Sequence, residues 1–134
     1  MALKFLSAVD YDLVGTLLDQ REGLLYISLI GMQAVFEERR DFIEKDKVNK
    51  YRENLLHLLR SENTDDNIEI TLGGSVGLAI APKEWNKSQV LNYLTHKKIY
   101  YFGDKYRIDG NDYPLINHPK VTGMKVDKYI ISNI

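Results

Sequence analysis

Two carboxylates in the stretch Lys98–Asp112 could bind a metal ion. The apolar run from Ile99 to Phe102 predicts a buried strand that ends at Gly103, and Asp104 follows at once. Open α/β sheets bind ligands at the carboxyl ends of their strands. The turn at 110–112 could bring Asp112 back toward Asp104. Oxygen ligands of this kind suit Mg²⁺, although the same residues also make an ordinary solvated turn.

A second acidic pair lies near the N-terminus, where Asp10 and Asp12 precede Gly15-Thr16. This segment faintly resembles the Asp-x-Asp-Gly-Thr loop of haloacid-dehalogenase-type phosphotransferases, whose first aspartate is the nucleophile. Two extra residues separate Asp12 from Gly15, and they would disrupt the tight turn that places both carboxylates on one metal. The alternative is a plain loop between a helix and a strand.

Composition restricts the class of protein. At 134 residues, with 44% hydrophobic residues, the chain is the size of one globular domain or of two small lobes. A formal net charge of −1 provides no field for nucleic acid, and no apolar run approaches the ~20 residues of a membrane span. The N-terminus does not resemble a signal peptide, and no cysteine is present for disulfides or thiolate metal sites. We expect a cytoplasmic protein that binds neither nucleic acid nor membrane.

The N-terminal two thirds alternate between strand and helix patterns. Residues 1–14 are compatible with a short helix or a strand, and a long helical pattern covers 36–59, with a possible break near residue 46. Four segments favour strands joined as two hairpins by glycine-containing turns. These segments are 16–20, 24–30, 68–72 and 76–81.

The C-terminal third contains shorter elements around the two carboxylates. Residues 86–95 have helical spacing, and the strand at 98–102 follows. A proline-bounded loop at 114–119 leads to a last strand at 121–126. These two strands would belong to a parallel sheet, and their unpaired edges would favour association between chains.

Several motifs together resemble the eukaryotic phosphomannomutase family, which has a haloacid-dehalogenase fold with a cap. The similarity covers roughly residues 15–126 in uninterrupted order. The matching segments are Gly15–Gly31, Phe36-Glu-Glu-Arg39, Gly73-Gly74 with Pro82–Lys87, Tyr101-Phe-Gly-Asp-Lys105 with Gly110-Asn-Asp112, and Pro119–Gly123.

The resemblance implies an α+β cap, with a four-stranded antiparallel sheet covered by helices on one face, plus the C-terminal part of an α/β haloacid-dehalogenase-like core. A residual core or linker helix would occupy 1–14, the cap 15–85 and the core segment 86–134. Family members are longer and begin with a half that carries the nucleophile loop. We expect that N-terminal core half to be missing here.

The resemblance also implies roles for the C-terminal residues. Lys87 matches the lysine that neutralises the phosphoryl group, and Asp104 matches the carboxylate that binds Mg²⁺, with Asp112 as a second candidate ligand. A further cation would be bound in the loop that follows, partly by backbone carbonyls. Its residues would be Ile116, His118 and Val121, where His118 replaces the family's aspartate.

In the cap, Arg21 and Arg39 match two arginines that bind the distal phosphate of the substrate. Met32 stands where the family has a third arginine, and a thioether cannot bind phosphate. Gly77 and Ala79 replace a serine and an aspartate that bind substrate. Three polar contacts of the family's cap are therefore replaced by residues that cannot make them.

Two functions follow from these matches and replacements. The first is that of a phosphomannomutase, which interconverts mannose 6-phosphate and mannose 1-phosphate through a hexose bisphosphate and so feeds GDP-mannose synthesis. This chain would be a truncated form of that enzyme, inactive in isolation. The alternative is a non-catalytic module derived from the cap, which pairs with itself or with a full-length relative. The resemblance implies a homodimer that forms through the cap.

Overall fold

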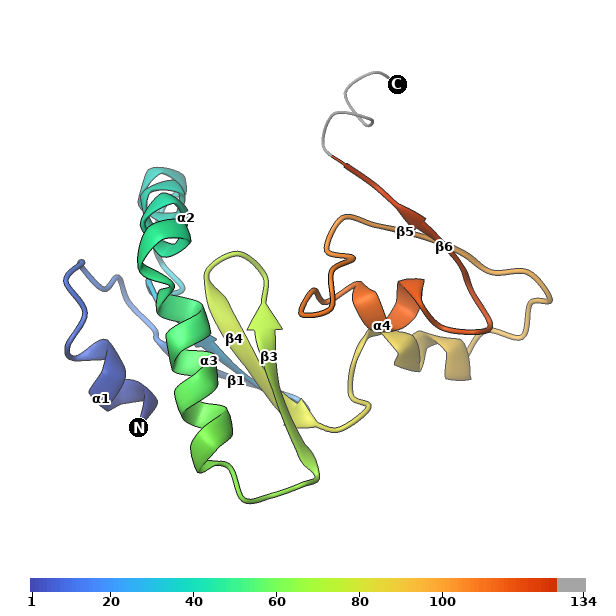
Figure 1. The fold of residues 1–134 in the computed structure, drawn as a ribbon, viewed down its shortest axis with the longest axis horizontal. Coiled ribbons are helices and arrows are strands. Elements are labelled where there is room, and N and C mark those ends of the chain that lie inside the picture. The colour runs from blue at the N-terminus through green and yellow to red at the C-terminus, as the bar shows by residue number, and fades with distance from the viewer. Residues whose placement is uncertain (128–134) are drawn as a thin grey trace. The chain divides into compact units, whose positions relative to one another are not determined.

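The computed structural model describes residues 1–127 and divides the chain into two compact units. Unit 1 runs from Met1 to Lys83, and unit 2 begins at Glu84 (Figure 1). The last seven residues of the predicted core segment, 128–134, lie outside the described residues. Within the described part of the chain, no helix has the length and apolar character needed to cross a membrane.

Unit 1 contains a four-stranded sheet with the strand order β1-β2-β4-β3. Every neighbouring pair is antiparallel, so the predicted antiparallel sheet is confirmed. Gly23 and Gly74 adopt positive φ angles of 70° and 60° in the two hairpin turns, a conformation that costs glycine little. The strands are β1 (Leu18–Arg21), β2 (Leu24–Ser28), β3 (Ile68–Gly73) and β4 (Gly77–Pro82).

Three helices precede or interrupt this sheet. The ambiguous N-terminus forms the helix α1 (Ala2–Leu6), and the long helical pattern forms α2 (Phe36–Asn49) and α3 (Tyr51–Glu62). The break that the pattern allowed is present, but it lies at Lys50 rather than near residue 46; Lys50 has left-handed φ and ψ angles of 57° and 38°. Asp46 fixes this position by accepting hydrogen bonds from the Arg52 amide at 3.0 Å and from Arg52 Nε at 2.7 Å.

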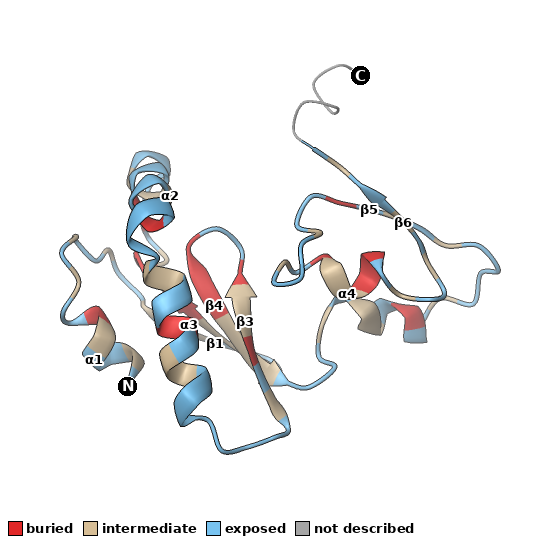
Figure 2. Ribbon diagram, in the orientation of Figure 1, coloured by how far each residue is buried: buried red, intermediate tan, exposed pale blue. Residues whose placement is uncertain are grey.

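The helices pack on one face of the sheet, as Figures 1 and 2 show. Phe42 on α2 is 1% exposed and packs against both Tyr11 and Tyr51, with ring centroids 5.3 Å and 6.2 Å away. Arg60 on α3 donates from Nε to the Ile70 carbonyl on the outer strand β3 at 2.9 Å. The buried core comprises Leu6, Ile27, Leu29, Ile30, Ala34, Phe42, Leu55, Leu56, Ile70, Val76 and Leu78.

Unit 2 contains a two-stranded parallel sheet of β5 (Tyr100–Gly103) and β6 (Thr122–Lys125), which confirms both predicted strands and their parallel direction. The prediction that the first of them is buried was wrong, because Tyr100 and Phe102 are 57% and 64% exposed. The predicted helix at 86–95 is instead the short 3₁₀ helix η1 (Lys87–Asn92), capped by the Asn86 side chain, which accepts from the Ser88 amide. The predicted loop at 114–119 begins inside a one-turn helix, α4 (Tyr113–Ile116), because proline is tolerated in the first turn of a helix.

Candidate functional site

The Asp112 carboxylate is the centre of the polar cluster in unit 2. Asp112 is 3% exposed, and three donors surround it. Oδ1 accepts hydrogen bonds from Lys87 Nζ at 2.5 Å and from the Tyr101 hydroxyl at 2.6 Å, and Oδ2 accepts one from the Lys105 amide at 2.9 Å. Lys87 also lies 3.4 Å from the Tyr101 hydroxyl. A lysine, a tyrosine and a buried aspartate therefore form one connected group.

Backbone geometry brings these residues together. A Cβ on Gly103 would lie 2.7 Å from Asp112 Cγ, so the glycine at the end of β5 leaves the space that the carboxylate occupies. The loop between them closes through the Asp112 amide, which donates to the Lys105 carbonyl at 3.1 Å. Lys87 is the first residue of η1, which contacts α4, where Asp112 is the N-cap residue. The cluster is thus assembled from η1, β5 and the start of α4.

The electrostatics of the cluster favour the charged lysine and the charged aspartate. Burial raises the pKa of Asp112, but the hydrogen bonds from Lys87, Tyr101 and the Lys105 amide outweigh burial and hold it at about 2. Burial lowers the pKa of Lys87, and the hydrogen bonds with Asp112 and Tyr101 reverse this and raise it. Burial and the contact with Asp112 raise the pKa of Tyr101. At neutral pH the group is an ammonium, a carboxylate and a neutral phenol.

The two predicted metal ligands, Asp104 and Asp112, differ in burial and in their partners. Both Asp112 oxygens already accept hydrogen bonds, one of them from an ammonium group, so Asp112 does not fit a metal ligand in this arrangement. Asp104 is exposed directly after β5, where its carboxylate has the right chemistry for Mg²⁺. Among residues 1–127, no group of three or more His, Asp or Glu side chains could hold a metal ion.

The residues predicted for a second cation lie in a tight turn between α4 and β6. The Val121 amide donates to the His118 carbonyl at 3.0 Å, and His118 Nδ1 accepts from the Lys120 amide at 3.1 Å. Ile116 is 7% exposed, and its side chain belongs to the buried part of unit 2. Within the described residues, the carbonyl of His118 is therefore used by the turn itself.

In unit 1, Arg39 contacts the backbone that leads into α2. Its Nε donates to the Ala34 carbonyl at 3.0 Å and its terminal nitrogen donates to the Met32 carbonyl at 3.1 Å. The structure thus places Arg39 beside Met32, the position at which the resemblance puts another arginine. The Arg39 guanidinium, predicted to bind phosphate, makes two hydrogen bonds that fix this backbone segment.

The other cap residues gather around Tyr26 on the sheet face opposite the helices. Tyr26 pairs with Ala79 across β2 and β4, and its hydroxyl donates to the Gly73 carbonyl at 3.0 Å. Arg21 lies over the Tyr26 ring, 5.2 Å from its centroid, and forms an ion pair with Asp19 at 2.6 Å. A Cβ on Gly77 would lie 2.5 Å from the ring and 2.3 Å from the Ile27 carbonyl oxygen. Tyr26 thus fills the space beside Gly77.

This packing predicts that Gly77→Ser will lower the stability of unit 1 by about 1–2 kcal/mol, because the new side chain would overlap rigid backbone and the Tyr26 ring. Ala79→Ser, two residues along the same strand and partly exposed, is the matched control and should change stability by less than about 0.5 kcal/mol. Urea unfolding followed by circular dichroism measures both. Equal stability of the two variants would show that Tyr26 does not restrict position 77.

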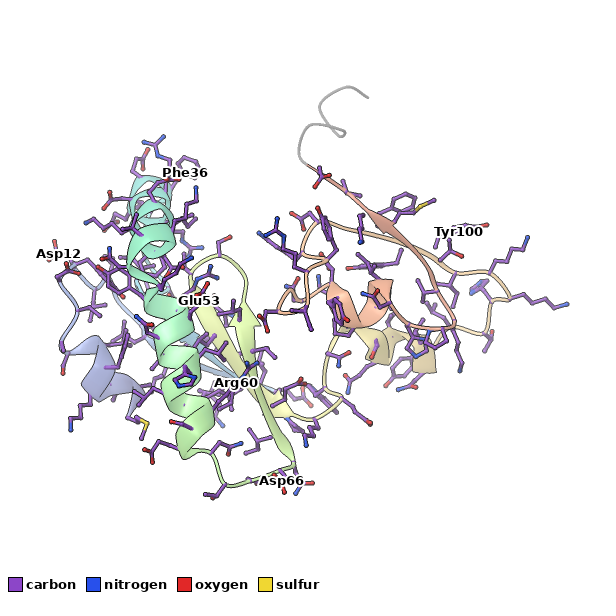
Figure 3. All side chains as sticks on the ribbon, viewed as in Figure 1. Asp12, Phe36, Glu53, Arg60, Asp66 and Tyr100 are labelled. Carbon is purple, nitrogen blue, oxygen red and sulfur yellow. The ribbon has the colours of Figure 1, made fainter. Side chains whose placement is uncertain are left out.

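The N-terminal carboxylates are not arranged as a nucleophile pair. Asp10 accepts a hydrogen bond from the Tyr51 hydroxyl at 2.5 Å, and this bond lowers the pKa of Asp10. Asp12, labelled in Figure 3, is exposed on the loop between α1 and β1. The interpretation as a loop between a helix and a strand is confirmed.

Sequence reasoning missed Tyr101 as a member of the site. In the structure Tyr100 and Phe102 are exposed while Tyr101 points to the opposite face, but the run of three aromatic residues shows no such alternation in the sequence. The signal in the sequence is chemical, because Tyr101 adds a hydroxyl where the family segment that it resembles, Phe-Phe-Gly-Asp-Lys, has phenylalanine. The separation of 11 positions between Tyr101 and its partner Asp112 hid the contact.

Comparisons with known proteins agree with the resemblance found in the sequence. The family described as eukaryotic phosphomannomutase matches residues 1–129. The phosphomannomutase of Encephalitozoon cuniculi is 33% identical over 128 residues, which are 92% of this chain and 50% of that protein. The phosphomannomutase of Arabidopsis thaliana is 36% identical over 126 residues, 92% of this chain and 51% of that protein.

A third relative, phosphomannomutase 2 of Dictyostelium discoideum, is 34% identical over 111 residues, 81% of this chain and 45% of that protein. The chain thus spans about half the length of the curated relatives that it matches. Because the family match extends over nearly the whole sequence, the chain belongs to the eukaryotic phosphomannomutase family.

Proposed function

We propose that this chain supplies the cap and the C-terminal core segment of a phosphomannomutase, which interconverts mannose 6-phosphate and mannose 1-phosphate and so feeds GDP-mannose synthesis. Residues 1–14 would be a linker helix, 15–85 the cap and 86–134 the core segment. The observation that carries the proposal is the Lys87–Asp112 ion pair beside the end of β5, in a chain whose family match covers residues 1–129.

The proposed role of Lys87 is electrostatic. A phosphoryl group in transfer carries negative charge, and a fixed ammonium lowers the energy of that state. The Lys87 side chain is 43% exposed, so one side of its ammonium remains accessible to a ligand while Asp112 holds the other. Its raised pKa keeps the ammonium charged at neutral pH.

Two further components belong to the proposal. Transfer needs an aspartate that accepts the phosphoryl group, and these 134 residues contain no Asp-x-Asp-Gly-Thr segment. Mg²⁺, which would supply charge at the equatorial phosphoryl oxygens, would use Asp104 from this chain. We therefore infer a cytoplasmic protein that acts on phosphosugars only together with a nucleophile-bearing segment, as a homodimer through the cap.

The non-catalytic alternative is favoured by one set of observations. Arg21 is paired with Asp19 and stacked on Tyr26, and Arg39 donates to two backbone carbonyls. Both arginines proposed for phosphate binding thus have internal partners. A cap of this kind would keep its fold and its surface for pairing while losing affinity for a phosphosugar.

We expect the isolated chain to show no conversion of mannose 1-phosphate in the presence of Mg²⁺ and a hexose bisphosphate, because no nucleophile is available. We also expect mannose 1-phosphate to raise the melting temperature of the wild type but not of Lys87→Met. Turnover by the isolated chain would contradict the proposal that the chain needs a nucleophile from another segment. An unchanged melting temperature in the wild type would favour the non-catalytic module.

A further inference from the structure

Tyr101 adds a contact that the Lys87–Asp112 pair does not need for charge balance. One ammonium and one carboxylate already neutralise each other at 2.5 Å. The Tyr101 hydroxyl nevertheless lies 2.6 Å from the same oxygen, Oδ1, that accepts from Lys87. It donates to that oxygen, and its own oxygen lies 3.4 Å from Lys87 Nζ. The phenol therefore contacts both members of the pair.

The position of Tyr101 on β5 makes this contact rigid. β5 pairs with β6 along its length, and Tyr101 is opposite Gly123 in that register. A tyrosine on a strand has two side-chain torsions, so its hydroxyl is fixed at low entropic cost, whereas the four-carbon chain of a lysine is flexible. The hydroxyl can therefore determine where Asp112 Oδ1 lies, and through it where the ammonium lies.

We propose that Tyr101 is a positioning residue, whose hydroxyl orients the Asp112 carboxylate so that Lys87 is held at the end of β5 and a divalent cation is kept off Asp112. The Lys105 amide occupies the other oxygen, Oδ2, at 2.9 Å. Lys87, Tyr101 and the Lys105 amide together occupy three of the roughly four lone-pair sites of this carboxylate, which is only 3% exposed. A role for Tyr101 in phosphoryl transfer rests on the proposed function. The hydrogen bonds that position Asp112 and Lys87 do not depend on it.

The test compares Tyr101→Phe with Tyr100→Phe, which removes a hydroxyl from the neighbouring, 57% exposed tyrosine labelled in Figure 3. Each full-length chain is labelled with a trace of acetic anhydride at one fixed neutral pH, and mass spectrometry gives the acylation rate of Lys87 relative to that of Lys97. Tyr101→Phe should raise the relative rate about three- to tenfold, the change that corresponds to one lost hydrogen bond. Tyr100→Phe should match the wild type.

An unchanged Lys87 rate in a folded Tyr101→Phe chain would overturn the proposal. The wild type supplies a second measurement that does not depend on how the variant folds. Millimolar Mg²⁺ should leave its relative Lys87 rate unchanged, because Asp112 is closed to the cation. A Mg²⁺-dependent rise would mean that the cation displaces Lys87 from Asp112, and it would also overturn the proposal. Neither measurement needs substrate, so failure of the phosphomannomutase assignment would be seen separately.

Discussion

Phe42→Ala is expected to destabilise unit 1 by about 3–5 kcal/mol, the range typical of a fully buried phenylalanine reduced to alanine. Phe42 is 1% exposed and packs edge-on against Tyr11 and nearly parallel to Tyr51. Truncation removes apolar contacts from both rings and leaves a cavity that two tyrosines anchored elsewhere cannot fill. Tyr11 donates to the Leu29 carbonyl, and Tyr51 donates to Asp10.

The measurement is urea unfolding followed by circular dichroism at 222 nm, because α2 and α3 provide most of the helical signal among the described residues. Phe36→Ala is the matched control: Phe36 begins the same helix and is 72% exposed (Figure 3). It should change stability by less than about 0.5 kcal/mol. Similar losses in both variants would mean that Phe42 is not central to the core.

The sheet of unit 1 could be predicted because its pattern is local. Ile68, Ile70 and Leu72 alternate with polar residues, and the structure buries these three more than Glu69. The antiparallel pairing follows from short turns at Gly23 and Gly74. A period of two, bounded by glycine turns, contains enough information to place a hairpin.

The short elements could not be predicted, because each depends on one specific contact. The helix break at Lys50 depends on the hydrogen bonds between Asp46 and Arg52, which hydrophobic periodicity does not report. The 3₁₀ helix η1 depends on its cap by Asn86, and α4 is a single turn that begins at Asp112. A single helical turn is stabilised by such side-chain and tertiary contacts rather than by the intrinsic helix propensity of its residues.

The site was predicted only in part, for the same reason. Asp104 and Asp112 were grouped because they are near in sequence, whereas the structure pairs Asp112 with Lys87, 25 residues away. The resemblance named both residues but gave no contact between them. Arg39 shows the opposite case: the resemblance implies that it binds phosphate, whereas its guanidinium donates hydrogen bonds to the Ala34 and Met32 carbonyls.

Asp112→Asn is expected to destabilise unit 2 by about 2–4 kcal/mol at neutral pH, since three donors lose a buried anionic acceptor. An amide nitrogen at this position would face Lys87 and Tyr101 or the Lys105 amide, all of which donate. Asp109→Asn is the matched control, because Asp109 is exposed in the same loop. Urea unfolding followed by the fluorescence of Trp85, the single tryptophan, reports on unit 2.

The pH dependence identifies the cause of this loss. The pKa of Asp112 in the folded protein, about 2, lies below its ordinary value of 3.8, so the carboxylate stabilises the fold fully above pH 3.8 and loses this effect as the pH falls to about 2. This shift corresponds to about 2 kcal/mol. The wild type should therefore approach Asp112→Asn in stability between pH 4 and pH 2, while Asp109→Asn follows the wild type. A difference that stays constant over this range would mean that the loss arises from packing and not from the charge that holds Lys87.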